Sequence, residues 1–502
     1  MKSVLWKKYQ HGIQLLSKHR AFLAIKLREH SEFDVNEISR FFEAIQSWMK
    51  ENRRIDFFLL FNRQREEFWQ EPARIQKYQE LICVDISSNE LKGCVWKNFG
   101  YSSAEMASFL RKELDDPLKK IAEQQKVPVL SSRQPLLLET VQIPKPWGHE
   151  EWYTGVEKRG VVSVVEGRYS TELPYAMSLF RQEYLKDHSD SLILMKTLNP
   201  VAEEVIGDLY LEMHEQKWEV YVVTSIDLEA WPSGEGVVKA GLNTERVLDY
   251  QERFGDEWAR PYLEDFREQI AVYEKTRREI DLHFDELRKK EGIDLLEPLT
   301  PALTQVFLNQ IPELQRKNEK QLREQVYDFV GKQKVRVGDV VTFPPRQMHS
   351  LQHGVEVIEF QTPHFERLIV MFGQKVLTQS NWDTDDAFAV MKPEIYQSPT
   401  FEKLGETEAW KKERIVDFPD FVADRITVQP QCEYTEQTGD DYHLLIGVTG
   451  EGTIHSSGNT PFTFASKSGV FLPASLRDYT IRNSSKSLDA IPLIYLKAMP
   501  KS

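Results

Sequence analysis

Four side chains that could bind a metal ion or move a proton lie in one short segment of the sequence. Glu212 and His214 stand at alternate positions, and so do Lys217 and Glu219. Because side chains on a strand alternate between its two faces, each pair shares a face if residues 209–223 are extended. A tight hairpin turn between the pairs would bring all four to one point. A surface hairpin with scattered charges accounts equally well for the alternation.

A second candidate ligand stands in the stretch GDVVTFPPRQMHSLQ. Gly338 and Asp339 are typical of a tight turn before a strand. Pro344 and the proline after it end that strand and stiffen the loop that carries His349. A stiff loop can hold an imidazole in place for a metal ion. A single histidine near a strand end is usually structural, so the case for a site depends on pairing His349 with the first cluster.

The composition limits the classes of function. With 502 residues, of which 41% are apolar and 11% aromatic, the chain is long enough for about two to four domains with packed cores. The formal net charge of −14 argues against a nucleic-acid binder or an anionic-membrane binder, but it permits a small anionic ligand. Three cysteines without CxxC spacing indicate neither a disulfide framework nor a thiolate zinc site. No signal peptide or membrane-spanning run is evident, so we expect a cytoplasmic protein.

The N-terminal part of the chain carries no chemical motif. Residues 1–135 are predicted to be a mostly α-helical domain of unknown role, with a capping box at Ser102–Glu105. The segment IDFFLLF (55–61) could be a strand or a buried helix, because an unbroken apolar run has no diagnostic period. Residues 127–135 have the composition of a linker.

Short strands that could position the chemical residues are expected from residue 136 onward. They are interrupted at 243–330, where apolar residues recur at three- and four-residue steps and predict an amphipathic helix. The stripe comprises Leu263, Phe266, Ile270, Tyr273, Ile280, Phe284 and Leu287. The glycine-to-proline pattern of Gly338 and Pro344 occurs again, with a shorter spacing, at Gly469 and Pro473. This similarity predicts that a similar β unit recurs.

Taken together, the motifs resemble the cupin superfamily, in which a ligand cluster on a strand is followed by Gly-x5-Pro-x3-4-His. In more detail the chain resembles the type I mannose-6-phosphate isomerases over about residues 140–500, with the motifs in the same order. The matching segments are Lys145-Pro-Trp-Gly148, LILMKTLNP (192–200), Leu211-Glu-Met-His214, Lys217-Trp-Glu219, Lys239-Ala-Gly-Leu242, GDVVTFPPRQMH (338–349), Glu359-Phe-Gln361, Phe365-Glu-Arg367 and GVTGEGTIH with GVFLPASLRDYTI.

The resemblance implies a mainly β fold of cupin jelly-roll barrels (RmlC-like), with an N-terminal α-helical domain and a helical insertion. The metal-binding barrel would comprise 136–242 and 331–400, the insertion 243–330, and a second β domain without metal ligands 401–502. In that domain no histidine follows the proline of PASLRDYTI, so Tyr479 is expected to pack rather than to bind metal.

The resemblance also implies one divalent metal ion, zinc in most of the family, with Fe2+ and Mn2+ as alternatives. Its ligands would be Glu212, His214, Glu219 and His349, and the catalytic or substrate-binding cations would be Lys217 and Arg367. The implied activity is a metal-dependent aldose–ketose isomerisation of a sugar phosphate, mannose 6-phosphate to fructose 6-phosphate or a related sugar. The partner is a small sugar or sugar phosphate.

The sequence departs from the family at two places. Glu212 stands where the family has glutamine, and the additional negative charge is expected to lower the Lewis acidity of the metal. The spacing before Arg367 is one residue short, and His364 stands where the family has an acidic residue.

Two other functions remain open at the level of sequence. His214, Glu219 and His349 form a two-histidine, one-carboxylate set that would suit Fe(II) in a cupin dioxygenase. A non-catalytic, sugar-binding or regulatory cupin would bind metal and ligand without turnover.

Overall fold

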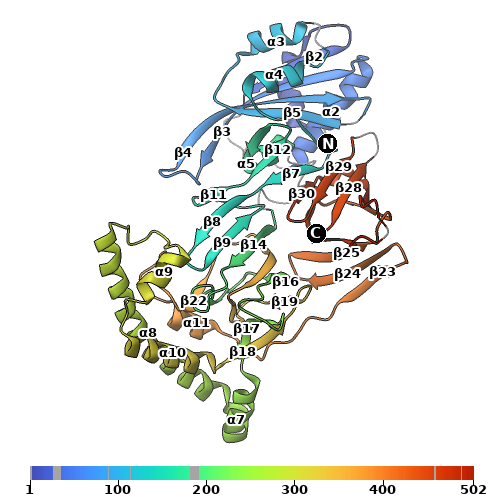
Figure 1. Ribbon diagram of the computed structural model, residues 1–502. Helices are drawn as coiled ribbons and strands as arrows, with labels where there is room; N and C mark the ends of the chain where they lie inside the picture. The colour runs from blue at the N-terminus through green and yellow to red at the C-terminus, as the bar shows by residue number, and fades with distance from the viewer. Residues whose placement is uncertain are drawn as a thin grey trace. The chain divides into compact units, whose positions relative to one another are not determined.

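The computed structural model describes residues 3–26, 35–88, 90–112, 115–180, 192–456, 460–487 and 489–501. The chain divides into two compact units (Figure 1). Unit 1 comprises Met1–Val141, Tyr153–Ile193 and Glu402–Ser502, and unit 2 comprises Gln142–Trp152 and Leu194–Phe401. Residues 136–141, 153–180, 192 and 193, which were expected in the metal-binding barrel, therefore lie in unit 1.

The N-terminal part of unit 1 is a six-stranded sheet, not the mostly helical domain expected from the sequence. Its strands, in sheet order, are β1 (Gln14–Leu15), β2 (Arg20–Lys26), β3 (Asp56–Glu67), β4 (Arg74–Asp85), β5 (Glu90–Lys97) and β6 (Leu130–Ser131). Its helices are α1 (Val4–Tyr9), α2 (Val35–Glu51), α3 (Ser103–Arg111) and α4 (Pro117–Gln125).

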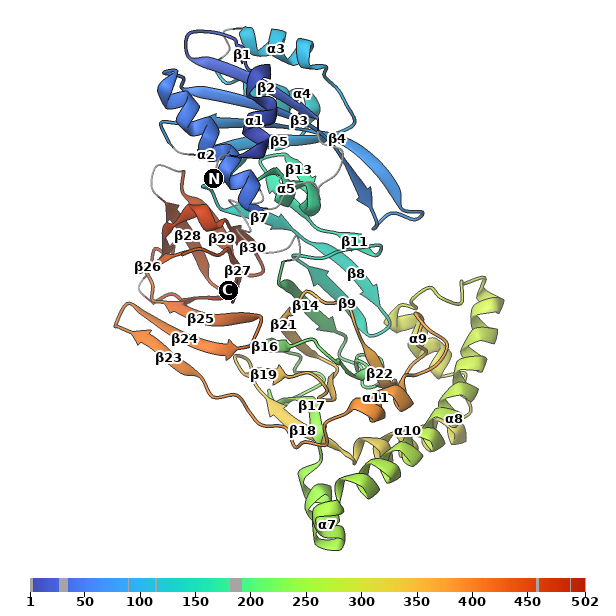
Figure 2. The same cartoon turned by 180° about the vertical axis from the view of Figure 1, so that it is seen from behind.

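Strand β3 shows why the sequence pattern misled. It pairs in parallel with β2 and antiparallel with β4, so it lies inside the sheet. Residues 57–61 are all buried, because helices cover both faces of the sheet. Ile121 of α4 packs in one core with Phe58, and Trp48 of α2 meets Phe57 with ring centroids 5.5 Å apart. Figure 2 shows α2 and α4 beside the strands of this sheet. A strand buried on both faces loses the period-two pattern that identifies strands in a sequence.

Two smaller expectations in this region had different outcomes. The capping box is confirmed: Ser102 accepts a hydrogen bond from the Glu105 amide, and the Glu105 carboxylate accepts one from the Ser102 amide. The expected linker is wrong, because β6 pairs with β5. Ser131 and Ser132 are buried, and the Ser132 hydroxyl accepts a hydrogen bond from the Leu91 amide.

The remainder of unit 1 is built on a nine-stranded and a four-stranded sheet, whose facing side chains form one hydrophobic cluster. The nine-stranded sheet has the order β13 (Tyr169–Glu172), β12 (Ser163–Glu166), β7 (Leu136–Glu139), β30 (Gly469–Leu472), β27 (His443–Thr449), β32 (Leu493–Pro500), β25 (Phe421–Val428), β24 (Trp410–Asp417) and β23 (Glu402–Glu406). The four-stranded sheet has the order β26 (Glu433–Gln437), β31 (Asp478–Asn483), β28 (Glu451–Ser456) and β29 (Phe462–Ala465). The buried helix α5 (Leu173–Leu179) and the ribbon β10 (Val156–Glu157) and β11 (Gly160–Val161) complete the unit.

Unit 2 is a two-sheet β-sandwich with helices. Its six-stranded sheet has the order β19 (Val340–Phe343), β16 (Glu219–Ile226), β21 (Val355–Gln361), β14 (Leu194–Pro200), β9 (Gly148–Trp152) and β8 (Val141–Lys145). Its five-stranded sheet has the order β18 (Val330–Val335), β17 (Gly236–Leu242), β20 (His349–Leu351), β15 (Leu211–Met213) and β22 (Leu368–Met371). Tyr221 and Val357 of the first sheet share one core with Ala240, Leu351 and Ile369 of the second.

The helices of unit 2 are α7 (Thr244–Phe254), α8 (Ala259–Glu291), α9 (Pro301–Leu308), α10 (Glu313–Tyr327) and α11 (Thr384–Val390). They pack on the core that the two sheets share, except α9, which packs with the C-terminal part of α8 in a smaller cluster around Phe284 and Phe307. The amphipathic stripe predicted from the sequence is the buried face of α8, which runs beside α10 (Figure 1). Phe266 of this face stacks on Phe329 with ring centroids 5.0 Å apart. No helix in the described part of the chain is long and apolar enough to cross a membrane.

The two units contain the same strand connectivity twice. The sheet order β19-β16-β21-β14-β9-β8 of unit 2 is repeated in unit 1 as β30-β27-β32-β25-β24-β23. The order β18-β17-β20-β15 is likewise repeated as β29-β28-β31-β26. The correspondence follows chain order, and it aligns β19, which follows Gly338, with β30, which begins at Gly469. The β unit that the sequence predicted to recur is therefore present as a ten-strand repeat.

Candidate metal centre

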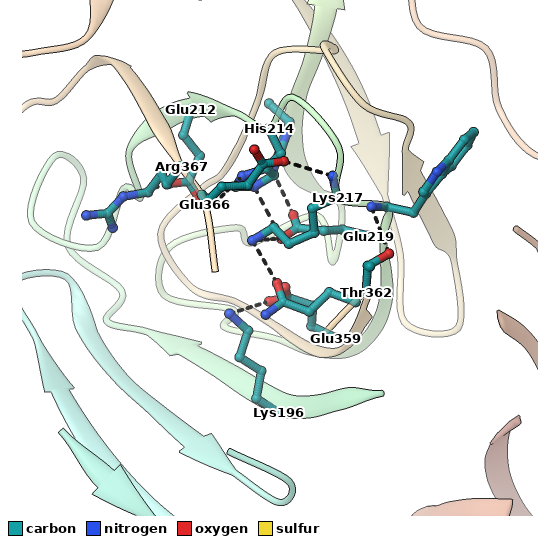
Figure 3. Close-up of polar contacts among 12 residues, drawn as sticks. Lys196, Glu212, His214, Lys217, Glu219, Glu359, Thr362, Glu366 and Arg367 are labelled. Atoms are coloured by element: carbon teal, nitrogen blue, oxygen red, sulfur yellow. Dashed lines mark hydrogen bonds and ion pairs between the residues drawn. The ribbon is translucent and has the colours of Figure 1, made fainter. Parts of the chain in front are cut away.

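The two ligand-bearing segments lie in opposite sheets rather than in one hairpin. Glu212 is on β15 of the five-stranded sheet, where it pairs directly with His349 of β20. Glu219 begins β16 of the six-stranded sheet. Residues 214–218 therefore cross from one sheet to the other, and the expected hairpin is wrong. The polar side chains still converge, because both strands point them into the space between the sheets (Figure 3).

Both imidazole rings are oriented by main-chain carbonyls. His214 Nδ1 lies 2.8 Å from the carbonyl oxygen of Glu366, and His349 Nδ1 lies 3.2 Å from that of Gln347. A carbonyl oxygen only accepts, so each Nδ1 carries the hydrogen and each Nε2 keeps its lone pair. Phe343 stacks on the His349 ring with centroids 4.0 Å apart and restricts its rotation.

Glu219 lies between the two histidines. Its Oε2 is 3.0 Å from His349 Nε2, and its Oε1 is 3.2 Å from His214 Nε2. Burial alone would raise the pKa of this carboxyl, but the nearby His214 and Lys217, together with the close contact of the His349 ring, lower it well below its ordinary value. Burial lowers the pKa of His214, although the attraction of Glu219 acts in the opposite direction. The lowered pKa favours the neutral imidazole. An ionised carboxylate that faces two Nε2 lone pairs is the arrangement a cation stabilises.

The donor set fits a divalent metal ion. Single donor atoms of Glu212, His214 and His349 all lie within 4.8 Å of one another. Glu212 Oε2 and His214 Nε2 are buried and make no hydrogen bond in the described part of the chain. Leaving such atoms without a partner is costly, and a bound cation would remove that cost. Imidazole nitrogen and carboxylate oxygen are ligands that Zn2+ prefers.

The two predicted cations occupy different parts of the site. Lys217 is buried, and its Nζ donates to Glu219 Oε1 at 2.8 Å and to Gln361 Oε1 at 3.0 Å. The Arg367 side chain is 23% exposed, its Nε lies 3.7 Å from Glu212 Oε2, and its guanidinium points away from the histidines (Figure 3). Lys217 is therefore inside the cluster, whereas Arg367 stands at its rim.

Three largely buried charged residues that were not among the predicted site residues lie beside the candidate metal centre. Lys196 Nζ on β14 lies 3.2 Å from Glu359 Oε2 on β21, and Glu150 on β9 lies on the same face. Burial raises the pKa of Glu359 well above its ordinary value, against the attraction of Lys196 and with the added repulsion of Glu219. Burial also tends to raise the pKa of Glu150, but the positive charges of Lys145 and Lys196 outweigh this effect and lower the pKa to about 2. The sequence signal that could have revealed these residues is Lys196, a lysine inside the apolar strand segment 192–200.

Glu366 has a positioning role that no sequence pattern indicated. Its carbonyl orients His214, and its carboxylate accepts hydrogen bonds from the amides of Gln216 and Lys217, the latter at 2.9 Å. The neighbouring Thr362 hydroxyl accepts one from the Trp218 amide at 3.2 Å (Figure 3). The loop 362–367 thus holds the crossing between the two ligand-bearing strands.

Comparison with known proteins finds similarity in structure alone. No protein-family model and no curated protein matches the sequence. The apo form of mannose 6-phosphate isomerase from Salmonella typhimurium is 11% identical, and the match covers 73% of this chain and 99% of that chain with a TM-score of 0.50. A single-residue variant of phosphomannose isomerase from the same bacterium is 12% identical, with 73% and 100% covered and a TM-score of 0.50.

The chain shares its fold with mannose-6-phosphate isomerases. The isomerase from Bacillus subtilis also matches, at 12% identity over 73% of this chain and 99% of that chain, with a TM-score of 0.48. The mainly β class is confirmed, and the resemblance read from the motifs is confirmed at the level of the isomerase fold. The assignment of individual ligands and catalytic residues stays a prediction.

Proposed function

We propose that the protein is a metal-dependent aldose–ketose isomerase that acts on a sugar phosphate, mannose 6-phosphate or a closely related sugar. The observation that carries the proposal is the convergence of the Nε2 atoms of His214 and His349 on Glu219 and beside Glu212. The isomerase fold supports the proposal, and so do two basic residues at this site, Lys217 inside the cluster and Arg367 at its rim.

Glu212, His214, Glu219 and His349 would hold one divalent ion, most simply Zn2+. Such an ion supplies Lewis-acid stabilisation of negative charge on the sugar oxygens when it is bound. Glu212 and Glu219 together bring two negative charges to the centre. Lys217 offsets part of that charge through its contact with Glu219.

The isomerisation moves one proton from C2 of the aldose to C1 of the ketose and one hydroxyl proton from O2 to O1. Glu359 is the carboxyl placed to carry a proton, because its pKa is raised and its Oε1 is buried without a hydrogen bond in the described part of the chain. A proton carrier works best when its pKa lies near the working pH. Lys196 holds this carboxyl in position at 3.2 Å.

The two cations have separate roles in this proposal. Lys217 donates hydrogen bonds inside the cluster and is suited to stabilising an enediol oxygen. Arg367, partly exposed at the rim, is suited to the phosphate, since a guanidinium binds phosphate oxygens through paired N–H donors.

Metal analysis of the purified protein, followed by an assay of mannose 6-phosphate isomerisation, tests the proposal. We expect about one metal ion per chain, loss of turnover on chelation, and recovery when Zn2+ is restored. His214→Ala and His349→Ala should each lose most of the metal and remain folded, whereas His283→Ala, on the exposed face of α8, should keep it. Full metal content in both site variants would place the metal elsewhere.

Variants of the cations separate the phosphate contact from the metal site. Lys217→Met and Arg367→Met should keep metal and fold but reduce turnover by about 10²-fold or more, the scale of a lost charge contact in a transition state. Replacing mannose 6-phosphate by free mannose should erase most of the effect of Arg367→Met. Unchanged kinetics in both variants would remove the phosphate pocket from the proposal and leave the metal site standing.

The second candidate is the Fe(II) dioxygenase, for which the sequence offered His214, Glu219 and His349 as the two-histidine, one-carboxylate set. In the structure Glu212 also groups closely with the two histidines and offers a second candidate for the carboxylate. The contacts of Glu219 with both Nε2 atoms favour the isomerase, because a fourth protein ligand leaves fewer open positions. Oxygen consumption by the Fe(II)-loaded protein, without isomerisation, would decide for the dioxygenase.

A further inference from the structure

A pocket in unit 2 is lined by residues of α8 and α9 and of the loop that follows β22. The empty space between its lining atoms, including the part that is open to solvent, is about 440 Å3. Its walls are mostly apolar and include Ile206, Phe284, Leu299 and Leu308. None of the residues placed at the metal centre lines it.

Three cations also line this pocket, and two of them are paired. Arg277 Nε lies 3.0 Å from Asp281 Oδ1, and Lys375 Nζ lies 2.5 Å from Asp285 Oδ1. Arg288 is 3% exposed, and no carboxylate in the described part of the chain lies within ion-pair distance of it. It is a buried cation that makes no direct ion pair with a described residue, and Asp285, Asp294 and Glu297 attract its charge only from a greater distance.

The hydrogen bonds of Arg288 leave one edge of its guanidinium free. Nη1 donates to the carbonyl oxygens of Asp294 and Glu297 at 2.8 and 2.6 Å. Nε is buried and makes no hydrogen bond to any described residue. Buried charges in proteins are nearly always paired, because the cost of removing an unpaired charge from water is several kcal/mol.

We propose that this pocket is a binding site for a small monocarboxylate whose carboxylate pairs with the Nε edge of Arg288 and whose short alkyl body contacts Phe284 and Leu308. One guanidinium without a direct ion pair can take one singly charged anion. A planar carboxylate matches the two N–H groups of a guanidinium edge. The apolar walls favour an alkyl body and make a phosphate dianion costly to desolvate.

Calorimetric titration with acetate, butyrate and inorganic phosphate tests the proposal on the full-length protein. We expect butyrate to bind more tightly than acetate and phosphate to bind most weakly at this site. Arg288→Met should weaken butyrate binding at least tenfold, whereas the control Arg260→Met, exposed on the same helix and paired with Glu264, should leave it unchanged. Equal butyrate affinity in wild type and Arg288→Met would overturn the proposal, as would the absence of saturable butyrate binding in the wild type.

Two further variants keep the test decisive. Leu308→Trp fills the pocket and leaves Arg288 in place, so it should abolish butyrate binding even if Arg288→Met does not fold. Arg367→Met removes a rim cation of the metal centre, and butyrate binding should persist in it and in chelated protein. Loss of binding on chelation would assign the anion to the metal centre and contradict the second site, whatever the outcome of the isomerase assay.

Discussion

The charge of the ligand at position 212 sets the electrophilicity of the proposed metal. Two carboxylates, Glu212 and Glu219, would neutralise a divalent ion, whereas a glutamine at 212 would leave one positive charge. The Glu212 carboxylate also lies 3.7 Å from Arg367 Nε and therefore competes with a phosphate for that cation.

We therefore expect Glu212→Gln to retain metal and to equal or exceed the wild type in kcat/KM. Both reasons act in the same direction: the metal becomes more electrophilic, and Arg367 is released for the substrate. Metal content by atomic emission and steady-state kinetics measure the two effects. Loss of metal in this variant would show instead that the carboxylate is indispensable for binding.

The other residue-scale prediction concerns Glu366, which touches the centre only through His214 and the amides of Gln216 and Lys217. Glu366→Ala leaves the carbonyl but releases both amides, so the ligand-bearing turn should loosen. We expect metal affinity to fall about 10- to 100-fold, the usual effect of losing a group that orients a ligand. A competition titration with a chelator measures it.

Glu366→Gln serves as the matched variant, because an amide oxygen can still accept both hydrogen bonds. It should recover most of the affinity. Equal metal affinity in wild type and Glu366→Ala would contradict a positioning role.

At the scale of elements, Lys239 lies where β17 meets α10. Its Nζ lies 3.1 Å from the centroid of the Tyr327 ring, and it donates a hydrogen bond to Gln352 Oε1. Burial lowers its pKa from the ordinary 10.5 to about 7, and Arg323 adds to the effect while Asp208 opposes it. The strand and the helix therefore enclose a lysine that is close to losing its charge at neutral pH.

The sign of the resulting pH dependence follows from that shift. Between pH 7 and 10 the unfolded chain keeps the proton on Lys239 and the folded protein releases it, so the free energy of unfolding rises with pH. From pH 7 to 9 we expect a rise of about 2 kcal/mol that Lys239→Met lacks. Chemical denaturation at both pH values, with the exposed Lys334→Met as control, measures it. An identical rise in Lys239→Met would contradict the buried neutral lysine.

At the scale of the whole molecule, the repeated ten-strand unit carries the same buried charges with the signs reversed. In unit 2, Lys196 pairs with Glu359 across β14 and β21. At the equivalent register of unit 1, Asp424 pairs with Lys497 across β25 and β32, with Nζ to Oδ2 3.2 Å. Lys412 takes the place of Glu150.

The ligand positions of the repeat hold a different set of groups. Tyr479 aligns with His349, His443 with Glu219, and Glu436 with Glu212, by strand pairing. The Tyr479 hydroxyl lies 2.9 Å from His443 Nδ1 and 3.4 Å from Glu436 Oε2, and Lys497 Nζ lies 2.5 Å from Glu436 Oε1. In unit 1, these positions are therefore connected by hydrogen bonds and by an ion pair with Lys497. The equivalent positions of unit 2 hold the candidate metal ligands.

Lys497→Met should therefore destabilise the protein, but by less than the cost of about 3–5 kcal/mol for a buried charge left without any partner. Lys412 still pairs with Asp424 and Glu436 in this variant, and Arg414 still pairs with Asp424. The folded fraction should retain about one metal ion per chain and its turnover, since the metal centre is built in the other unit. Denaturant unfolding and metal analysis, with the exposed Lys486→Met as control, check both parts. Loss of metal from folded Lys497→Met would contradict separate roles for the two units.

The sequence by itself determined what depends on neighbours along the chain. Strand alternation predicted that Glu212 and His214 share a face, the capping box predicted the start of a helix at Ser102, and the apolar stripe predicted α8. The order of motifs predicted the isomerase fold. These signals are local because side-chain alternation, capping and helical periodicity are fixed within a few residues.

Only the tertiary structure decided which strands lie opposite one another. It placed Glu212 and Glu219 in different sheets, used the loop around Glu366 to orient His214, and aligned Lys196 with Glu359. It also showed that the N-terminal region is built on a sheet and not on helices. The sequence did not indicate this, because β3 is buried on both faces and its side chains show no period-two pattern. Pairing between distant strands depends on the packing of whole faces against one another, and no short stretch of sequence contains that information.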